Sequence, residues 1–260
     1  MNHWTELSIE YANQRNYLDE LYTVYPIAPE GIRDINDKLW GTAEESFNQK
    51  NNVALIKSLL KMKLFPIKDS YVAYIRKDPR AIERNPQTIN RLCGRLYDIG
   101  LNEILERCTE PKETNRQIGP LFKRWLAKGT LGVPLLNTKN FLQTRENAIL
   151  DASDAESMIF ANRHLGYNRN KGLDFVARFN NKYIIGEAKF LTDFGGHQGA
   201  QFEDAISTLQ TDTDRAIKIA ILDGVLYITP KRGNKIYNFI TRNNANIMSA
   251  LVLREYLYQI

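Results

Sequence analysis

The sequence predicts an α/β (α+β) protein with a mostly helical N-terminal half, and two observations predict this fold class. Up to about residue 110, apolar residues recur at the spacing of amphipathic helices. From about residue 150 the pattern changes to helix, strand, strand, helix, strand, strand. The polar stretch 111–115 lies between them. We therefore expect a helical region over residues 1–110 and a sheet-bearing region over 111–260, with one compact domain as the alternative.

One segment of the helical half bears on function. Pro86 opens a run of apolar residues at helical spacing, and the same pattern repeats after Gly100. We therefore expect two helices joined at Gly100. Such a pair reads a DNA major groove in helix-turn-helix proteins, but an αα-hairpin that packs into a core is the commoner use of the pattern.

The C-terminal half begins with a predicted helix and a predicted β-hairpin. Ser153 and Glu156 have the spacing of a capping box, which marks the first residues of a helix. Alternating apolar residues on both sides of Asn180-Asn181 indicate two antiparallel strands joined by a short turn. The hairpin is the element on which the functional prediction depends.

The later elements are predicted from the same patterns. An amphipathic helix is expected around residues 202–209. A second hairpin is expected from strands 217–222 and 225–229, with its turn at Asp223-Gly224. The last thirty residues have apolar positions typical of helices, although residues 251–260 fit a strand equally well.

Composition restricts the class of protein. With 260 residues, 43% hydrophobic and 25% charged, the chain lies in the globular range. The 35 Lys and Arg against 30 Asp and Glu give +5, a modest charge that favours a polyanion as partner. Two cysteines, Cys93 and Cys108, cannot form a cysteine-rich zinc site and fit a reducing compartment. Because neither a signal-peptide pattern nor a long apolar run occurs, we expect a soluble, cytoplasmic protein.

The first predicted hairpin places three ionisable residues together. Counting outward from a two-residue loop at 180–181 pairs Asp174 with Glu187. Since side chains alternate along a strand, Glu187 and Lys189 share one face, and Asp174 joins them from the neighbouring strand at about 5 Å between Cβ atoms. A four-residue loop preserves this register, whereas a three-residue loop breaks it.

These residue types in this arrangement suggest metal-dependent hydrolysis. Two carboxylates opposite one another destabilise a sheet unless a cation compensates. Mg²⁺ prefers oxygen ligands and is commonly held by one or two carboxylates together with water and phosphate. We predict that Asp174 and Glu187 bind Mg²⁺ and that Lys189 orients and helps to deprotonate an attacking water while it stabilises charge on the phosphorus oxygens. The structural alternative is a hairpin in which Lys189 only neutralises the two acids.

The spacing of these residues resembles a known signature. Gly172-Leu173-Asp174, twelve further residues and then Glu187-Ala188-Lys189 are similar to the motif of the PD-(D/E)XK nuclease superfamily, and type II restriction endonucleases look most alike. The resemblance covers residues 150–230. It departs from the motif at Leu173, where the superfamily's name has proline.

The resemblance carries further expectations. It implies a restriction-endonuclease-like core with a mixed central β-sheet flanked by helices. It implies that Asp174, Glu187 and the backbone carbonyl of Ala188 bind Mg²⁺, and that the enzyme cuts both strands of a short DNA sequence, leaving 5′-phosphates. A palindromic target requires a homodimer, because two identical sites must reach two strands. A cognate DNA methyltransferase is the implied genetic partner.

Other residues are candidates on weaker grounds. Glu156 is a candidate third acid because superfamily members often carry one on the preceding helix, although its capping-box position accounts for it. A glycine-rich segment follows the second strand, so Gln198 and Gln201 are candidate DNA contacts. His197 is left outside the catalytic set, because a lone histidine in a polar loop is usually solvated. The basic candidates for phosphate contact, with solvated surface residues as the alternative, are Arg116, Lys123, Arg124, Lys231 and Arg232.

The leading prediction is therefore a type II restriction endonuclease, and two other functions stay open. A PD-(D/E)XK nuclease of DNA repair, junction resolution or transposition would share the same site. A DNA-binding protein without catalysis would instead use the helix pair around Gly100.

Overall fold

The computed structural model describes residues 1–14, 16–27, 33–111, 117–230 and 233–260. The chain forms two compact units: Met1–Ile27 together with Thr114–Ile260, and Ala28–Glu113. The first 27 residues therefore group with the sheet-bearing unit and not with residues 28–113. Tyr17, Leu21 and Val24 are buried in one core cluster with residues of the sheet, a long-range contact that periodicity along the chain does not show.

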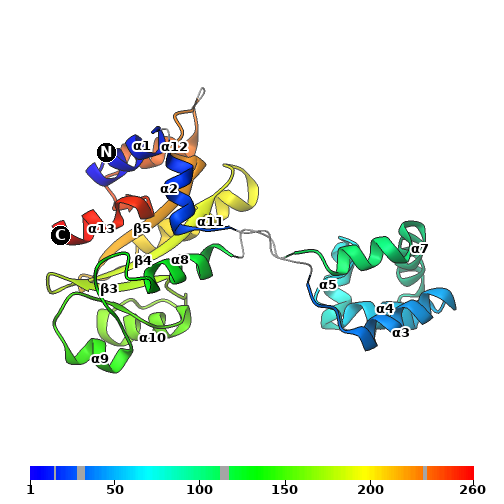
Figure 1. The fold of residues 1–260 in the computed structure, drawn as a ribbon. Helices are drawn as coiled ribbons and strands as arrows, with labels where there is room; N and C mark the ends of the chain where they lie inside the picture. Colours follow the sequence, from blue (N-terminus) through cyan, green and yellow to red (C-terminus); the bar gives the residue numbers. More distant parts are fainter. Residues whose placement is uncertain (15, 28–32, 112–116, 231–232) are drawn as a thin grey trace. The chain divides into compact units, whose positions relative to one another are not determined.

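The sheet-bearing unit consists of a mixed sheet and the helices around it (Figure 1). Its elements are α1 (His3–Ala12), α2 (Tyr17–Val24), α8 (Ile118–Ala127), β1 (Leu135–Leu136), α9 (Thr138–Gln143), β2 (Ala148–Leu150), α10 (Asp154–Leu165), β3 (Phe175–Phe179), β4 (Lys182–Leu191), α11 (Gly196–Leu209), β5 (Ile217–Gly224), the 3₁₀ helix η2 (Val225–Tyr227), α12 (Lys235–Arg242), β6 (Ile247–Met248) and α13 (Ala250–Gln259).

The sheet has six strands in the described part of the chain, in the order β1-β2-β3-β4-β5-β6. Strands β2, β3 and β4 are antiparallel neighbours, whereas β1 with β2, β4 with β5 and β5 with β6 are parallel pairs. Asn180 and Asn181 both have positive φ, at 50° and 61°, as a two-residue turn of type I′ requires. The turn sets the register that pairs Phe179 with Lys182 and confirms the predicted hairpin.

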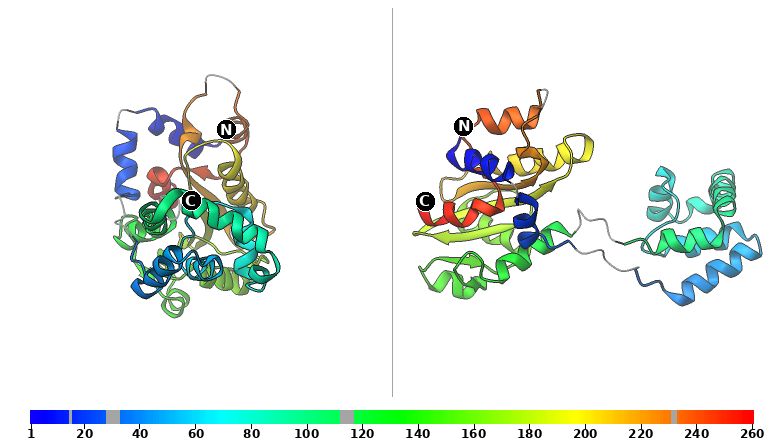
Figure 2. Two further views of the ribbon diagram at one scale, coloured as in Figure 1. Left: turned by 90° about the vertical axis from the view of Figure 1, so that its right-hand side faces the viewer. Right: turned by 45° about the horizontal axis from the view of Figure 1, so that its top comes forward.

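Helices cover both faces of this sheet (Figures 1 and 2). The face that carries Ala188 and Ile221 is buried against α2, α8 and α13. The face that carries Ile185 and Leu222 is buried against α10, α11 and α12. Since side chains alternate along β4, Glu187 and Lys189 lie on the same face as Ile185.

The second predicted hairpin is wrong. Strand β5 continues through Asp223 to Gly224 and leads into η2, and its strand neighbours β4 and β6 are both parallel to it. Gly224 has φ 100°, and a Cβ added there would lie 2.0 Å from the Leu191 carbonyl oxygen. Glycine is therefore needed for the close approach of β5 to β4, and the Asp-Gly pair is not a hairpin turn.

The C-terminal residues are helical, which decides between the two alternatives for 251–260. Ser249 is the N-cap of α13, and its side chain accepts a hydrogen bond from the Leu251 N–H. The predicted capping box of α10 is confirmed, because Ser153 and Glu156 exchange both of its hydrogen bonds. With the mixed sheet and flanking helices, these elements confirm the predicted fold class.

The second unit is helical throughout its regular elements. They are α3 (Asp37–Asn48), α4 (Asn52–Leu60), α5 (Ser70–Lys77), α6 (Ala81–Arg84) and α7 (Pro86–Cys108), and they share one apolar core. Within α7, Gly100 has non-helical dihedrals of φ 79° and ψ 163°, so the predicted pair of helices joined at Gly100 is confirmed. Cys93 and Cys108 are both free and buried.

Candidate active site

Three ionisable side chains meet where β3 begins, beside the C-terminal half of β4. The register pairs Phe175 with Gly186, so Asp174, one residue earlier, lies opposite Glu187. The ammonium of Lys189 lies 2.9 Å from Asp174 Oδ2 and 2.9 Å from Glu187 Oε2. The structure therefore brings together the three residues that the hairpin register predicted.

The backbone of β4 also takes part in this arrangement. The Ala188 N–H donates a hydrogen bond of 3.0 Å to Asp174 Oδ2. The N–H and C=O groups of one strand residue face the same neighbouring strand. The carbonyl of Ala188 is thus directed to the side on which Asp174 lies, where the resemblance expects a metal ligand.

Glu187 lies in an environment that is costly for a carboxylate. The residue is 2% exposed, and its Oε1 atom has no hydrogen-bond partner. Burial, followed by the negative charge of Asp174, raises the pKa of Glu187 to about 7, against the lowering effect of Lys189 and Lys171. A buried carboxylate with one unsatisfied oxygen is a site where a further cation is stabilised.

Lys189 is the cationic side chain that the protein places between the two acids. Burial acts to lower the pKa of Lys189, but the charges of Asp174 and Glu187 and its hydrogen bonds to both carboxylates raise it overall. The side chain is therefore an ammonium group that donates to both acids. It occupies the position between two carboxylates in which a sheet needs positive charge.

Two further charged residues adjoin the cluster, and neither was predicted from the sequence. Lys171 Nζ lies 3.4 Å from Glu187 Oε1 and 2.9 Å from Asp204 Oδ1. Asp204, on α11, is also 4.0 Å from Lys189 Nζ. The available signal for Lys171 was its position directly before the motif 172–174. The helical spacing of α11 did not show which strand its polar residues would approach.

The oxygen donors of this cluster fit a Mg²⁺ ion that takes its remaining ligands from water and substrate phosphate. No group of three or more His, Cys, Asp or Glu side chains that could hold a metal occurs in the described residues. Mg²⁺, however, keeps several waters and needs only one or two carboxylates beside substrate phosphate. Asp174, Glu187 with its unsatisfied oxygen and the Ala188 carbonyl provide that set.

Glu156 is engaged in the helix cap. Its Oε2 accepts hydrogen bonds from the Ser153 N–H at 2.8 Å and the Ser153 hydroxyl at 2.7 Å. The backbone N–H and hydroxyl of Ser153 lower the pKa of Glu156, as expected for a capping carboxylate. These contacts account for Glu156 without a catalytic role.

A groove beside the cluster contains two of the predicted basic residues. It has a volume of about 250 Å³ and is lined by Lys123, Arg124 and Asp174, among others. Lys123 is already engaged, since its Nζ lies 2.5 Å from Asp154 Oδ1 and donates to the Ala152 carbonyl at 3.0 Å. Arg124 is exposed. Of the two, Arg124 is the better placed to meet a phosphate.

The remaining predicted DNA contacts lie on α11 or outside the described residues. Gln198 is 8% exposed, and its Oε1 accepts a hydrogen bond from the Thr192 N–H at 3.3 Å, so this side chain holds the end of β4 to α11. Gln201 is half-buried on the same helix. His197 falls within α11, and its side chain is not among those described. Three basic candidates lie outside the described residues: Arg116, Lys231 and Arg232.

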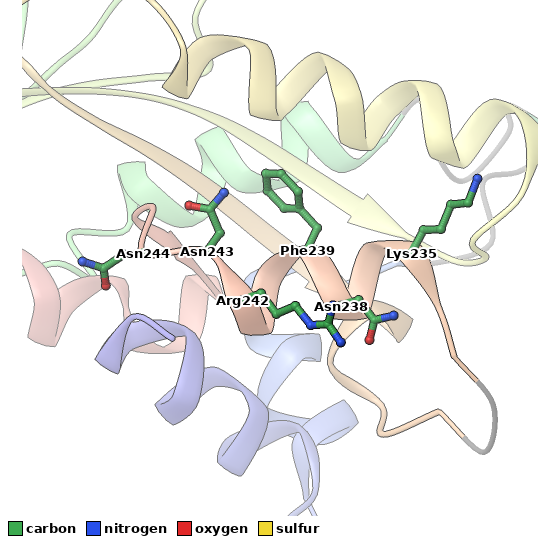
Figure 3. Close-up of a pocket in the computed structure, with 6 residues that line it drawn as sticks. All are labelled: Lys235, Asn238, Phe239, Arg242, Asn243 and Asn244. Atoms are coloured by element: carbon green, nitrogen blue, oxygen red, sulfur yellow. The ribbon is translucent and has the colours of Figure 1, made fainter.

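A second hollow, of about 600 Å³, lies on α12 (Figure 3). Phe239 points toward α11, where its ring packs edge-on against Phe202 at 5.6 Å between centroids. The other described lining residues are basic or amide-bearing and carry no carboxylate, so this hollow does not provide a metal site: Lys235, Asn238, Arg242, Asn243 and Asn244.

The mixed sheet flanked by helices is consistent with the restriction-endonuclease-like fold. The family model described as Tsp45I type II restriction enzyme matches residues 2–260. The chain therefore belongs to this family of PD-(D/E)XK type II restriction endonucleases. No curated protein and no solved structure matched the chain in two further comparisons.

Family membership confirms the leading functional prediction. The protein is a type II restriction endonuclease, a site-specific deoxyribonuclease that acts on double-stranded DNA. The alternatives of a repair or junction-resolving nuclease and of a non-catalytic DNA-binding protein are replaced by this assignment. None of the described helices is both long enough and apolar enough to span a bilayer.

Proposed function

We propose that Asp174, Glu187 and Lys189 form the active site of this restriction enzyme and that cleavage depends on Mg²⁺ and leaves 5′-phosphates. The observation that carries this proposal is the ammonium of Lys189, which lies 2.9 Å from oxygens of both carboxylates. The two acids and the Ala188 carbonyl would hold the ion. When bound, Mg²⁺ supplies Lewis acidity toward the phosphate and lowers the pKa of water.

The chain's own residues then have distinct roles. Asp174 is oriented by the Ala188 N–H, and Glu187 is held in a buried position beside it. The raised pKa of Lys189 supports a role as hydrogen-bond donor. Its ammonium orients the attacking water and stabilises the negative charge that develops on the phosphorus oxygens. This assignment favours the donor part of its predicted role over the base part.

DNA reaches this site along the groove at the start of β3. The exposed guanidinium of Arg124 would contact a phosphate, with Lys123 held at its side by Asp154. Gln201 remains a candidate base contact on α11, whereas the bond to Thr192 gives Gln198 a structural use. Phosphate contacts of this kind position the duplex and do not select its sequence.

The assembly and its setting follow from the reaction. Cutting both strands of a palindromic site requires two identical active sites related by a twofold axis, which supports a homodimer. Cleavage of a short sequence endangers the host's own DNA, which supports a cognate DNA methyltransferase as genetic partner. A cytoplasmic location follows from the same DNA substrate.

The proposal is tested on a sequenced plasmid incubated with Mg²⁺ or with chelator, followed by mapping of the ends. Discrete fragments with ligatable 5′-phosphates are expected in Mg²⁺ only, and Asp174→Asn should yield none. Asp214→Asn, at an exposed loop position, is the matched control and should cut like the parent enzyme. Cleavage in chelator, or normal cleavage by Asp174→Asn, would contradict the proposal.

A further inference from the structure

Lys171, in the segment between α10 and β3, makes four polar contacts. Its Nζ donates to the Asp204 carbonyl at 2.8 Å and lies 2.9 Å from Asp204 Oδ1 and 3.4 Å from Thr208 Oγ1. It also lies 3.4 Å from Glu187 Oε1. The side chain is 22% exposed, so it is largely withdrawn from water. Three contacts thus fix Lys171 to α11, and the fourth reaches the active site.

Through the fourth contact, each oxygen of the Glu187 carboxylate has a different lysine as its cationic neighbour. Oε2 accepts a hydrogen bond from Lys189, whereas Oε1 has no hydrogen bond and faces Lys171 as its cation. Asp204 closes the arrangement, because it pairs with Lys171 and lies 4.0 Å from Lys189. Glu187, Lys171, Asp204 and Lys189 therefore form a ring of alternating charges.

The two lysines differ in what anchors them. Lys189 depends on Asp174 and Glu187, the same groups that a divalent cation would engage. Lys171 is anchored independently of them, through Asp204 and Thr208 on α11. If Lys189 turns toward water and phosphate during the reaction, Lys171 still holds one oxygen of Glu187.

We propose that Lys171 is a positioning residue for DNA cleavage: it orients the Glu187 carboxylate toward the metal and keeps it there when Lys189 leaves. This inference rests on the proposed metal site. Outer residues that orient a metal ligand typically change metal affinity by about 10-fold to 100-fold when they are removed. A purely structural tie between the segment before β3 and α11 would instead affect stability alone.

The sign of the change in metal affinity tests the role. Lys171→Gln removes a positive charge near the cation site, so by electrostatics alone Mn²⁺ should bind more tightly. Loss of orientation predicts the opposite, about tenfold weaker binding of Mn²⁺ to the DNA-free enzyme, measured by electron paramagnetic resonance. Cleavage by Lys171→Gln should then recover in part at high Mg²⁺ concentration.

Lys182→Gln is the matched control, because it removes an exposed lysine at the start of β4, the strand that carries Glu187. It should keep the parent's Mn²⁺ affinity and activity. Lys171→Arg, which retains the charge next to Asp204, is a second variant that preserves the fold and should bind Mn²⁺ more tightly than Lys171→Gln.

Three results would overturn the inference. They are an unchanged Mn²⁺ affinity with a lowered Tm, tighter Mn²⁺ binding by Lys171→Gln, and equal affinities of the Gln and Arg variants. Glu187→Gln separates this failure from failure of the metal site itself. If Glu187→Gln also binds Mn²⁺ normally, the proposed site is wrong; if it loses Mn²⁺ while Lys171→Gln does not, only the positioning role is wrong.

Discussion

Two buried carboxylates, Glu187 and Asp223, lie on neighbouring strands of the sheet but differ in their hydrogen-bond and ion-pair partners. Glu187 on β4 lies on the face covered by α11, and Asp223 on β5 lies on the other face, next to the ends of α2 and α13. Asp223 accepts hydrogen bonds from the Tyr25 hydroxyl at 2.8 Å, the Ser249 hydroxyl at 2.5 Å and the Ala250 N–H at 3.3 Å. Both of its oxygens are thus satisfied by neutral donors. Glu187 has two lysines as partners and one oxygen without a hydrogen bond.

Burial by itself does not indicate whether an acid is functional or structural. Burial raises the pKa of Asp223 to about 6 and that of Glu187 to about 7, so the direction of the shift does not distinguish them. The partners do. A closed set of neutral donors ties the N-terminal segment and α13 to the sheet, which is a structural use. An incomplete set, in which one carboxylate oxygen lacks a hydrogen bond, is what a metal ion can complete.

The largest effect expected from this contrast is on catalysis. Glu187→Gln should lower kcat about a thousandfold, or about 4 kcal/mol of activation free energy, because the metal loses a charged ligand. Asp223→Asn should keep kcat within about threefold, since it lies on the opposite face from the site. Single-turnover cleavage of a duplex containing the target measures both. A comparable loss of kcat in Asp223→Asn would break the distinction between the two acids.

The next effect concerns stability and pH. The pKa of Asp223 is about 6 in the folded protein, whereas its ordinary value is 3.8. Between these pH values the folded state therefore binds more protons than the unfolded state. The contribution of Asp223 is therefore fully present below pH 4 and is lost as pH rises toward 6, with a slope of at most about 1.4 kcal/mol per pH unit. Urea unfolding of the metal-free protein from pH 4 to 7 should show this fall, relative to Asp223→Asn. Parallel curves for the two proteins would contradict the assignment.

The smallest effect concerns one donor of the structural set. Tyr25→Phe removes the hydroxyl that donates to Asp223 Oδ2 and should lower the free energy of unfolding at pH 8 by about 1–2 kcal/mol. Urea denaturation measures this change, and kcat should stay at the parent value. If Tyr25→Phe instead left stability intact and reduced cleavage, the Asp223 side of the sheet would belong to the functional site.

The sequence predicted the part of the site that depends on local rules. A two-residue turn fixes pairing at every later step of a hairpin, so Asn180-Asn181 sufficed to place Asp174 opposite Glu187. The turn predicted at Asp223-Gly224 was wrong, because an Asp-Gly pair occurs both in hairpin turns and, as here, at the buried end of a parallel strand. Parallel pairing joins segments distant in the chain, and no local signal identifies the partner.

The sequence by itself determined the helical and strand segments around the motif, the hairpin register and hence the group formed by Asp174, Glu187 and Lys189. Only the tertiary structure decided that residues 1–27 pack with the sheet, that Asp223 is satisfied by Tyr25 and Ser249, and that Lys171 and Asp204 close a ring around Glu187. The physical reason is the range of the interactions. Turn geometry and side-chain alternation act between near neighbours, whereas burial and ion pairing depend on which distant segments the folded chain brings together.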